Sequence, residues 1–398
     1  MKQNPNYTLI HLADTNFLFP YGQMIANHSH SVQLNSTGTV IWKYLKNPVE
    51  LPALTELVAQ ELETPAGELP ALQKDIKEFT EKLIALGIIT DNTPVQNKKA
   101  ACYLRIAGLT IKLCGPKEAF SENFHLFKVP SPEEKLAEAA TDQTIILTEE
   151  LPPQREDDLY LLRNPQLYIC DTADSYILQF PASTGLKEGH IRKDGRQAIF
   201  YCNPPYNKEL IYDLFHAIRI SFLYLAGRHH MYAIHSASIR YQDMAWLFSA
   251  PSGTGKSTHT NLWKQHLSTP VINGDLNLLA FENGRAVIHG IPWCGTSEIC
   301  DSHTWPLGGI TLLKQEPTNR LLPLGDSMLR LAVLQRLISP LWTKAMLHQA
   351  AAFVEELSPQ IFLGKLGCTV SPEAVYTIKE AIDGWCFAQS QNKTETIE

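Results

Sequence analysis

Hydrophobic residues recur at helical spacing in three stretches of the first ninety positions, after two short extended runs. The extended runs lie at residues 17–19 and from Ser31 to Leu34. Asn35 and Ser36 then provide capping side chains for the start of a helix. Apolar faces that repeat every three or four positions mark this helix and two more: Val40, Ile41, Tyr44 and Leu45; Leu54, Leu57, Val58 and Leu62; Leu72, Ile76, Phe79 and Leu83. Gly87 is the expected stop of the third helix.

From about residue 100 the pattern is dominated by strands, with helices following near the C-terminus. We expect strands within 103–113, 160–178, 233–240 and 245–249, a hairpin over 276–288, and helices at 211–226, 329–338, 343–357 and from Ser371 onward. Asn283-Gly284 at the hairpin tip favours a type I′ turn, because both central residues need positive φ. The polar stretch around Pro94 is the expected linker. We therefore predict an α+β protein with domains at 1–92 and 100–398, a linker at 93–99, and the core of the larger domain at about 230–315.

Charge and composition narrow the function classes. The chain of 398 residues carries 34 Lys and Arg against 41 Asp and Glu, a net charge of −7. It has no basic cluster, so nucleic-acid binding is not expected. We find no signal-peptide pattern and no run of about 18 uninterrupted apolar residues, so we expect no membrane association. The eight cysteines form no CxxC pair, which is typical of reduced thiols in a cytoplasmic protein.

The sequence LFSAPSGTGKSTHTNLW lies between an apolar strand and an amphipathic helix, the context that a phosphate-binding loop requires. The backbone N–H groups of Ser252, Gly253, Thr254 and Gly255 are expected to surround phosphate oxygens, with the helix N-terminus adding a favourable dipole. Lys256 is expected to reach the β- and γ-phosphates of ATP with its charge exposed to them, Ser257 to hold Mg²⁺, and Thr258 to complete the loop. Ala250 stands where the motif usually has Gly, and a small residue still fits there.

Two further residues are candidates for the chemistry. Asp275 follows the short apolar run 270–274, and a carboxylate at a strand tip would serve as catalytic base or Mg²⁺ ligand. An Asp after Asn-Gly is also a common turn residue. His235 ends an apolar stretch one strand before the loop, where it would stabilise phosphate charge. A single His in such a stretch is more often a hydrogen-bonded core residue.

Several of these residues together resemble the HPr serine kinase-like family, which shares its core with phosphoenolpyruvate carboxykinases. They are His235-Ser236-Ala237-Ser238, PSGTGKST, Asp275, the Asn283-Gly284 hairpin and Gly290-Ile291-Pro292-Trp293-Cys294-Gly295. The resemblance covers about 100–385 and implies a phosphotransferase whose loop binds nucleotide, whose Asp is base or metal ligand, and whose His contacts phosphate. HPr kinases have two adjacent acidic residues where this chain has Gly274 and Asp275. Glu298 could supply the second carboxylate, although a solvated loop Glu is an equal alternative.

The first domain resembles the winged-helix-like PqqD peptide-recognition domains. The carrying residues are 34–42 (LNSTGTVIW), Asp75, Phe79 and 86–89 (LGII). The resemblance implies that a leader peptide adds as a strand near Ser31 to Leu34 and packs on the helix at 72–86. The two halves together then indicate a kinase that modifies a Ser or Thr hydroxyl of a ribosomally made precursor peptide. This last step is an analogy, because a fold does not fix a substrate.

The sequence leaves three other functions open. A small-molecule kinase would phosphorylate a free hydroxy amino acid and use the first domain for regulation. A non-catalytic adaptor would bind nucleotide only, and the complete GKST motif with Asp275 opposes it. Phosphoenolpyruvate chemistry would need further basic and metal-binding residues that the sequence does not identify. Cys294, Cys300 and His303 have no standard zinc spacing. Assembly into a homo-oligomer is left open.

Overall fold

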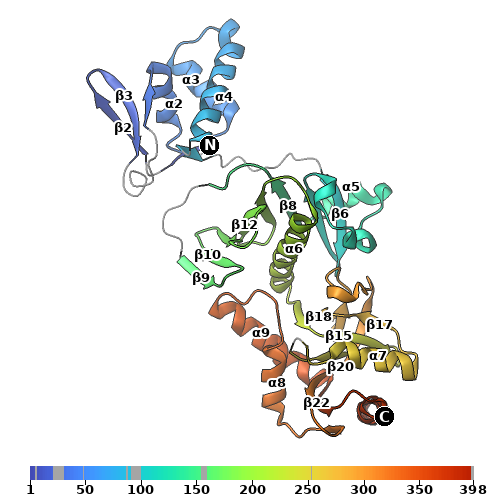
Figure 1. Ribbon diagram of the computed structural model, residues 1–398. Helices are drawn as coiled ribbons and strands as arrows, with labels where there is room; N and C mark the ends of the chain where they lie inside the picture. The colour runs from blue at the N-terminus through green and yellow to red at the C-terminus, as the bar shows by residue number, and fades with distance from the viewer. Residues whose placement is uncertain are drawn as a thin grey trace. The chain divides into compact units, whose positions relative to one another are not determined.

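The computed structural model describes residues 1–4, 7–20, 31–47, 49–86, 88–90, 100–153, 159–251 and 253–395 (Figure 1). The chain separates into two compact units. The first is Met1–Lys98 with Leu151–Asp158, and the second is Lys99–Glu150 with Leu159–Glu398. The expected stop at Gly87 and linker at 93–99 lie outside the described residues.

The described part of the first unit combines two small sheets with three helices, and the hydrophobic pattern predicts the helices and the extended runs of β3 and β4 but not β1, β2 or β5. Strands β2 (Tyr7–Leu12), β3 (Thr15–Pro20) and β4 (Val32–Leu34) form an antiparallel sheet in that order, and β1 (Lys2–Gln3) pairs with β5 (Ile89–Thr90). The helices are α2 (Ser36–Tyr44), α3 (Leu51–Glu61) and α4 (Leu69–Ala85), with the 3-10 turn η1 (Ala66–Glu68) before the last. Asn35 caps α2, its Oδ1 accepting a hydrogen bond from the Gly38 N–H at 2.7 Å. One buried cluster that includes Leu18, Ile41, Leu54 and Ile76 holds these elements together.

The second unit begins with an eight-stranded sheet. Its strands are, in spatial order, β6 (Ala100–Ile106), β7 (Leu109–Cys114), β8 (Gln143–Thr148), β13 (Gln197–Cys202), β12 (Leu186–Arg192), β11 (Ser175–Gln179), β10 (Tyr168–Asp171) and β9 (Leu159–Arg163). Short helical turns follow β7, namely η2 (Lys117–Ala119), η3 (Glu122–Phe127), η4 (Ser131–Glu133) and α5 (Glu134–Ala139). The strand-like pattern expected within 103–113 is found as β6 and β7, and Ala107 and Gly108 turn with positive φ between them.

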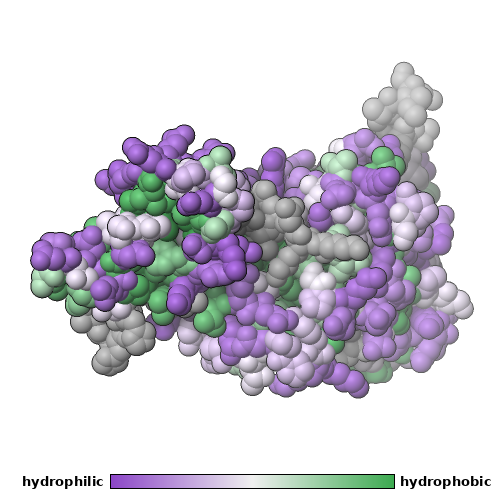
Figure 2. Space-filling model, turned by 90° about the horizontal axis from the view of Figure 1, so that it is seen from above, coloured by the Kyte–Doolittle hydropathy of each residue, from purple (hydrophilic) through white to green (hydrophobic). Residues whose placement is uncertain are grey.

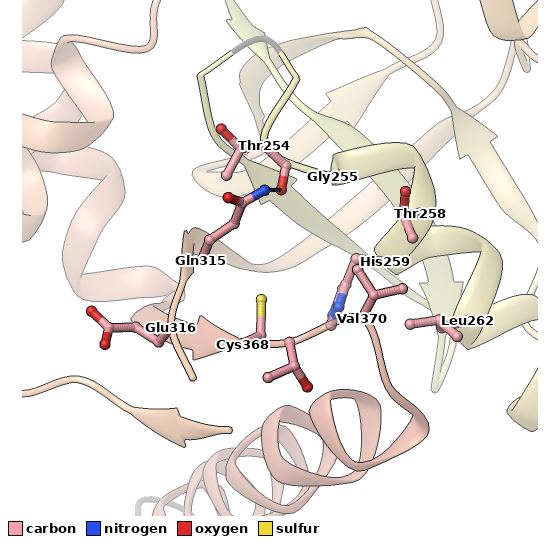
Figure 3. A pocket seen from close by; sticks show the side chains of 10 residues that line it. Thr254, Gly255, Thr258, His259, Leu262, Gln315, Glu316, Cys368 and Val370 are labelled. Carbon is pink, nitrogen blue, oxygen red and sulfur yellow. Dashed lines mark hydrogen bonds between the residues drawn. The ribbon is translucent and has the colours of Figure 1, made fainter. Parts of the chain in front are cut away.

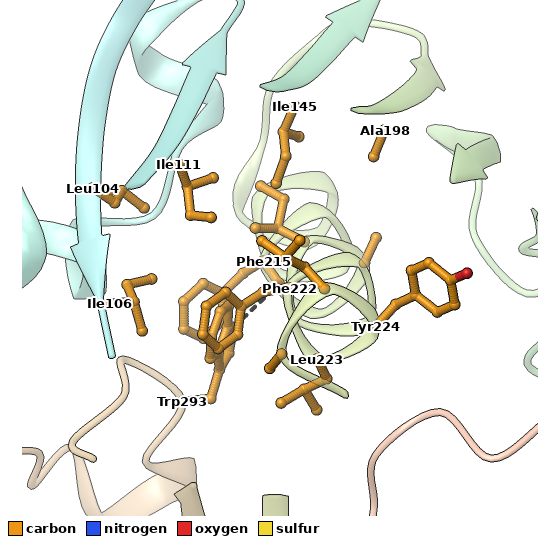
Figure 4. Close-up of a cluster of buried hydrophobic side chains, with 14 of the residues drawn as sticks. Leu104, Ile106, Ile111, Ile145, Ala198, Phe215, Phe222, Leu223, Tyr224 and Trp293 are labelled. Carbon is orange, nitrogen blue, oxygen red and sulfur yellow. Dashed lines mark hydrogen bonds between the residues drawn. The ribbon is translucent and has the colours of Figure 1, made fainter. Parts of the chain in front are cut away.

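A long helix, α6 (Lys208–Arg228), lies between this sheet and the rest of the unit. Phe215 and Phe222 on one of its faces pack against Trp293, and side chains of both sheets join the same buried cluster (Figure 4). Among the described helices, α6 alone has the length and hydropathy of a membrane span, and 61% of its most apolar window is buried inside the protein. These contacts are those of a core helix.

A second sheet carries the expected chemistry. Its main path is β14 (Tyr232–His235), β18 (Leu276–Glu282), β19 (Arg285–His289), β20 (Thr304–Gln315), β16 (Met244–Ser249), β15 (Ala237–Tyr241) and β17 (Val271–Asn273), and β22 (Phe362–Cys368) pairs with β20 and with β21 (Arg320–Leu321). The helices around it are α7 (Lys256–Leu267), α8 (Asp326–Leu334), α9 (Lys344–Leu357) and α10 (Pro372–Glu395), with the 3-10 turns η5 (Gly295–Ser297) and η6 (Ser358–Gln360).

Two sequence expectations about this sheet have different outcomes. The β18–β19 hairpin turns at Asn283 and Gly284 with φ of 50° and 75°, as the Asn-Gly signal predicts. The single strand expected at 233–240 is wrong, because the chain changes partners at Ser236. β14 pairs with β18, whereas β15 pairs with β16 and β17.

Most of the visible molecular surface is hydrophilic, with hydrophobic residues in smaller groups (Figure 2).

Candidate active site

The loop between β16 and α7 has the backbone form that an anion-binding turn needs. Gly253 and Gly255 have φ of 76° and 108°, values that other residues rarely adopt, and a Cβ placed on Gly253 would meet no atom within 4 Å. Gly255 is the N-cap of α7 and provides no side-chain cap, so the first N–H groups of this helix are available to a ligand. The predicted strand–loop–helix order is therefore found. Ser252 lies outside the described residues, and Ser257 and Thr258 are exposed on the first turn.

Lys256 is folded back against its own loop. Its side chain is only 8% exposed, and Nζ donates a hydrogen bond to the Ala250 carbonyl at 3.3 Å. Burial lowers the Lys256 pKa, the Asp275 charge opposes this shift, and the Arg336 charge adds to it. The expectation that the Lys256 charge is exposed is wrong, because the packing of the loop covers the side chain. Among the described residues the Lys256 ammonium group is bonded to a neutral carbonyl alone, and a buried ammonium group in that position gains from an anionic partner.

Asp275 and His235 form a hydrogen-bonded pair at the ends of adjacent strands. His235 is the last residue of β14 and Asp275 immediately precedes β18, which places His235 Nε2 at 3.1 Å from Asp275 Oδ1. The Ser249 hydroxyl donates to the His235 carbonyl at 2.6 Å, and this bond joins the pair to the strand before the loop. The His235 hydrogen bond is the largest cause of a lowered Asp275 pKa, with Lys256 and Arg219 contributing. The carboxylate is therefore ionised at neutral pH.

Buried amides hold the backbone of Asp275. The Asn273 side-chain oxygen accepts hydrogen bonds from the N–H groups of Asp275 and Leu276 at 3.0 and 3.1 Å. Asn277 donates to the Ser236 carbonyl at 2.7 Å and accepts from Ser238 Oγ at 2.6 Å. These satisfied polar groups fix the strand ends that carry the pair. In the sequence these residues stand out as Asn and Ser within apolar strands. The pattern alone does not show which groups they form hydrogen bonds with.

The segment from Cys294 to Glu298 packs directly on Asp275. A Cβ on Gly274 would lie 2.1 Å from Ser297 Oγ, and a Cβ on Gly295 would lie 2.7 Å from the Asp275 Cβ. A second acidic residue at position 274 would therefore displace this segment, which is a physical reason for the glycine. Glu298 is exposed at the end of η5 with φ of 53°. Among the described residues no group of three or more His, Cys, Asp or Glu side chains could hold a metal ion. A metal-binding role for Glu298 stays a prediction.

Two arginines that the sequence reasoning missed lie near the pair. Within the described parts of the chain, neither Arg219 nor Arg336 donates a side-chain hydrogen bond, and Arg336 Nε is buried. Burial lowers the Arg219 pKa while the Asp275 charge raises it. Arg219 is four residues after Phe215 and three before Phe222, so it shares the helix face that contacts Trp293. The sequence feature that could have identified Arg219 as a functional candidate is its position on the apolar face of a helix.

A pocket of about 230 Å³ opens beside the loop (Figure 3). One wall is the side of α7 from Thr258 to Leu262. The other comes from the ends of β20 and β22 and from Val370, which lies just after β22 and is 76% exposed. Gln315 Nε2 donates to the Thr254 carbonyl at 3.4 Å and so connects the far wall to the loop. His259 lies on the α7 wall, where burial lowers its pKa to about 4 and its Nε2 accepts from Trp263 Nε1 at 3.1 Å. The ring is neutral at physiological pH.

Comparison with known proteins gives one family match. Residues 22–89 match the model of coenzyme PQQ synthesis protein D (PqqD), which confirms the PqqD-like character of the first domain. The HPr(Ser) kinase/phosphatase from Coxiella burnetii is a weak structural neighbour, with a TM-score of 0.18, 14% identity, and coverage of 24% of this chain and 64% of that one. The alignment spans less than two thirds of that chain, and so slight a likeness supports no conclusion. A search of curated protein sequences gave no match.

Proposed function

We propose that the protein is an ATP-dependent kinase that phosphorylates a Ser or Thr hydroxyl of a ribosomally made precursor peptide. The main observation behind this proposal is that several groups suited to phosphate chemistry lie together at the start of α7. An uncapped helix N-terminus follows two glycines of positive φ, and the buried Lys256 ammonium and the His235–Asp275 pair lie beside it. Backbone N–H groups, a cation and an ionised carboxylate are the groups that phosphoryl transfer needs.

Each group has a role in the proposed reaction. The N–H groups of the loop and the Lys256 ammonium bind the phosphates, and the ammonium exchanges the Ala250 carbonyl for a phosphate oxygen. The Ser257 hydroxyl and the Asp275 carboxylate are oxygen ligands of the kind Mg²⁺ prefers, and the bound ion would neutralise phosphate charge. The acceptor oxygen forms a bond to the γ-phosphorus as the bond to ADP breaks. Asp275 accepts the hydrogen bond of the acceptor hydroxyl, whose proton is released as transfer completes, and His235 holds the carboxylate in place.

The pocket beside the loop supports binding of a whole nucleotide. It begins at Thr254 and Gly255 and has apolar side chains on both walls, Leu262 and Val370. A base stacked between these walls would have its phosphates next to the first turn of α7. The exposed Val370 side chain then has a function, because burial under a base removes it from water.

The first unit supports a peptide partner. Among the described strands, β4 pairs with β3 only, so no described strand occupies its other edge, where we propose that a peptide adds as a strand. Phe79 of α4 approaches the Leu34 side chain of β4 at Gly38, where a Cβ would lie 3.3 Å from both. A leader strand on β4 would therefore find α4 side chains beside it. The PqqD match over 22–89 includes these elements.

The experiment compares the full chain with a truncated protein of residues 93–398 on two acceptors, a full precursor peptide encoded beside the gene and its leaderless core. We expect both proteins to phosphorylate both acceptors when Mg·ATP is present. The truncated protein should have a higher KM than the full chain for the full precursor, and a similar KM for the leaderless core. Equal nucleotide affinity of the full and truncated proteins controls for folding. If the folded truncated protein handles the full precursor as efficiently as the full chain, leader guidance is wrong. Efficient phosphorylation of free serine or threonine would instead establish the small-molecule kinase.

A further inference from the structure

A second pocket lies away from the phosphate loop, where four elements of the second unit meet. It has a volume of about 260 Å³ and is lined from β11, the C-terminal end of α6, β14 and the first turn of α9. Its polar side chains include Tyr176, Tyr232, Lys193 and Arg228, together with Tyr224, Thr343 and Gln349. None of the loop residues, and neither member of the His235–Asp275 pair, lines it. The proposed kinase reaction therefore gives this pocket no role.

Two nearly buried tyrosines face this pocket. Tyr232 is 2% exposed and Tyr176 is 7% exposed. Within the described residues neither hydroxyl has a hydrogen bond, although both side chains line the pocket. Neither hydroxyl oxygen is among the unpaired side-chain atoms that are fully buried in the described residues, so both reach the open space of the pocket, where a ligand can accept a hydrogen bond from them. Burial raises the pKa of both phenols, so at neutral pH each keeps its proton and is a donor.

The charge at this pocket is positive. Lys193 is paired with Asp171 at 2.8 Å and lies over the Tyr176 ring. Arg228 forms no ion pair among the described residues, so its charge is not neutralised by a carboxylate. The α9 helix begins at the pocket, with Thr343 as its N-cap, and its N-terminus adds partial positive charge. The donors and the charge together favour an anion.

Aromatic packing fixes the shape of the pocket before any ligand arrives. Tyr224 stacks on Trp342 with ring centroids 5.7 Å apart and 7° between planes, and Tyr176 meets both rings edge-on at 5.5 and 5.1 Å. The Tyr224 hydroxyl donates to the Lys193 carbonyl at 2.8 Å, which holds the strand connection that carries Lys193. The donors therefore need little rearrangement to bind.

We propose that this pocket binds a small anionic metabolite, whose phosphate or carboxylate group accepts hydrogen bonds from Tyr176 and Tyr232 and pairs with Arg228. The ligand is a molecule other than the proposed kinase nucleotide. It would contact the C-terminal end of α6, the helix whose Phe215 and Phe222 support Trp293 near the other site. The proposal does not depend on kinase activity.

The test uses the full chain without nucleotide and three probes: inorganic phosphate, O-phosphoserine and citrate. Calorimetric titration and thermal shift measure binding to the parent, to Arg228→Ala, to Tyr232→Phe and to Lys256→Ala. We expect at least one probe to bind the parent, with affinity reduced about tenfold or more in the first two variants because a hydrogen bond to a charged group is lost. Lys256→Ala should weaken any binding of the probes to the phosphate loop, whereas the binding that Arg228→Ala weakens should keep the affinity of the parent, which separates this pocket from the phosphate loop. Preference for phosphate or for citrate identifies the anion.

Matched controls distinguish a binding role from a structural one. Tyr232→Phe removes a hydroxyl that bonds to no described residue, so the ligand-free variant should melt no lower than the parent. Tyr212→Phe, at a tyrosine that is 63% exposed, and Arg285→Ala, at an exposed arginine, should bind the probes normally. The proposal is overturned if no probe binds, or if binding is lost in Lys256→Ala and retained in Arg228→Ala. Loss of binding in Lys256→Ala would assign the anion to the phosphate loop.

Discussion

Asp275→Asn should separate nucleotide affinity from turnover. The substitution removes the carboxylate charge but keeps the shape, and the amide oxygen can still accept the His235 Nε2–H hydrogen bond. Asp275 is close enough to Lys256 for the two charges to interact, so phosphates bound by Lys256 also experience the carboxylate. Without Mg²⁺ the carboxylate repels ATP, and its removal should strengthen binding. With Mg²⁺ the same change removes a metal ligand and the acceptor for the substrate hydroxyl.

The size of each effect follows from the exposure and the role of the side chain. Two unit charges about 4 Å apart interact by roughly 1 kcal/mol in water and roughly 4 kcal/mol at an effective dielectric constant of about 20. The Asp275 side chain is 37% exposed, so solvent screening favours the lower value. We expect Mg²⁺-free ATP to bind about fivefold more tightly, corresponding to about 1 kcal/mol. Turnover with Mg²⁺ should fall by about 10²-fold or more.

Calorimetric titration of ATP with EDTA present, and steady-state kinetics with Mg²⁺, measure the two quantities on the same preparations. His235→Ala is the comparison, since loss of a positioning residue should cost less turnover than loss of the carboxylate. A reversed ranking of the two variants would make the role assignment wrong. Asp275→Asn with unchanged Mg²⁺-free affinity and turnover within a few-fold of the parent would refute the placement of the phosphates beside this carboxylate.

Three further outcomes are expected. Lys256→Ala should abolish phosphoryl transfer in a Mg·ATP assay while leaving the circular-dichroism spectrum unchanged, and activity within a few-fold of the parent would contradict the loop assignment. Val370→Asp should weaken ATP binding by about tenfold but leave tripolyphosphate binding unchanged, because it places a charge against the base and not the phosphates; parallel losses would place the base elsewhere. Burial holds the pKa of His259 and His216 at about 4 in the folded protein, whereas both residues have a pKa of about 6.5 in the unfolded chain. The free energy of unfolding should therefore fall as the pH decreases from 6.5 to 4, by about 1.4 kcal/mol per pH unit for each residue. His259→Gln keeps an acceptor for Trp263 and should reduce that slope by about one proton in denaturant titrations; an unchanged slope would contradict the buried neutral ring.

Sequence reasoning recovered the features that depend on local pattern. The three helices of the first unit follow from apolar spacing, the α2 start follows from Asn35, and the β18–β19 turn follows from Asn283-Gly284. The loop before α7 could be predicted because its backbone conformation requires glycine at Gly253 and Gly255, so the glycines appear in the sequence itself. In each case the residues that determine the structure are within a few positions of one another.

Features that depend on distant partners were missed or misjudged. The division at Ser236 follows from pairing with β18, about forty residues later, and no local signal marks it. Burial of Lys256 and the position of Arg219 beside Asp275 depend on how α6 and the strand ends pack. The pocket wall at Val370 lies just after the end of β22, which pairs with β20. Hydrophobic periodicity reports which face is buried but not which element covers it.

The strand order of the second sheet also determines when each part of the protein can form during synthesis. The strands and helices described between Met1 and Thr90 are complete at Thr90, whereas β16 pairs with β20 and one wall of the pocket reaches Val370. At about 5–20 residues per second, a ribosome needs on the order of 15–60 s to cover that interval. A chain that stops before β22 would retain the elements that match PqqD without the complete pocket beside the loop. Under the proposed function, such a fragment would compete for precursor peptide without phosphorylating it, so premature termination would inhibit the intact enzyme as well as reduce its amount.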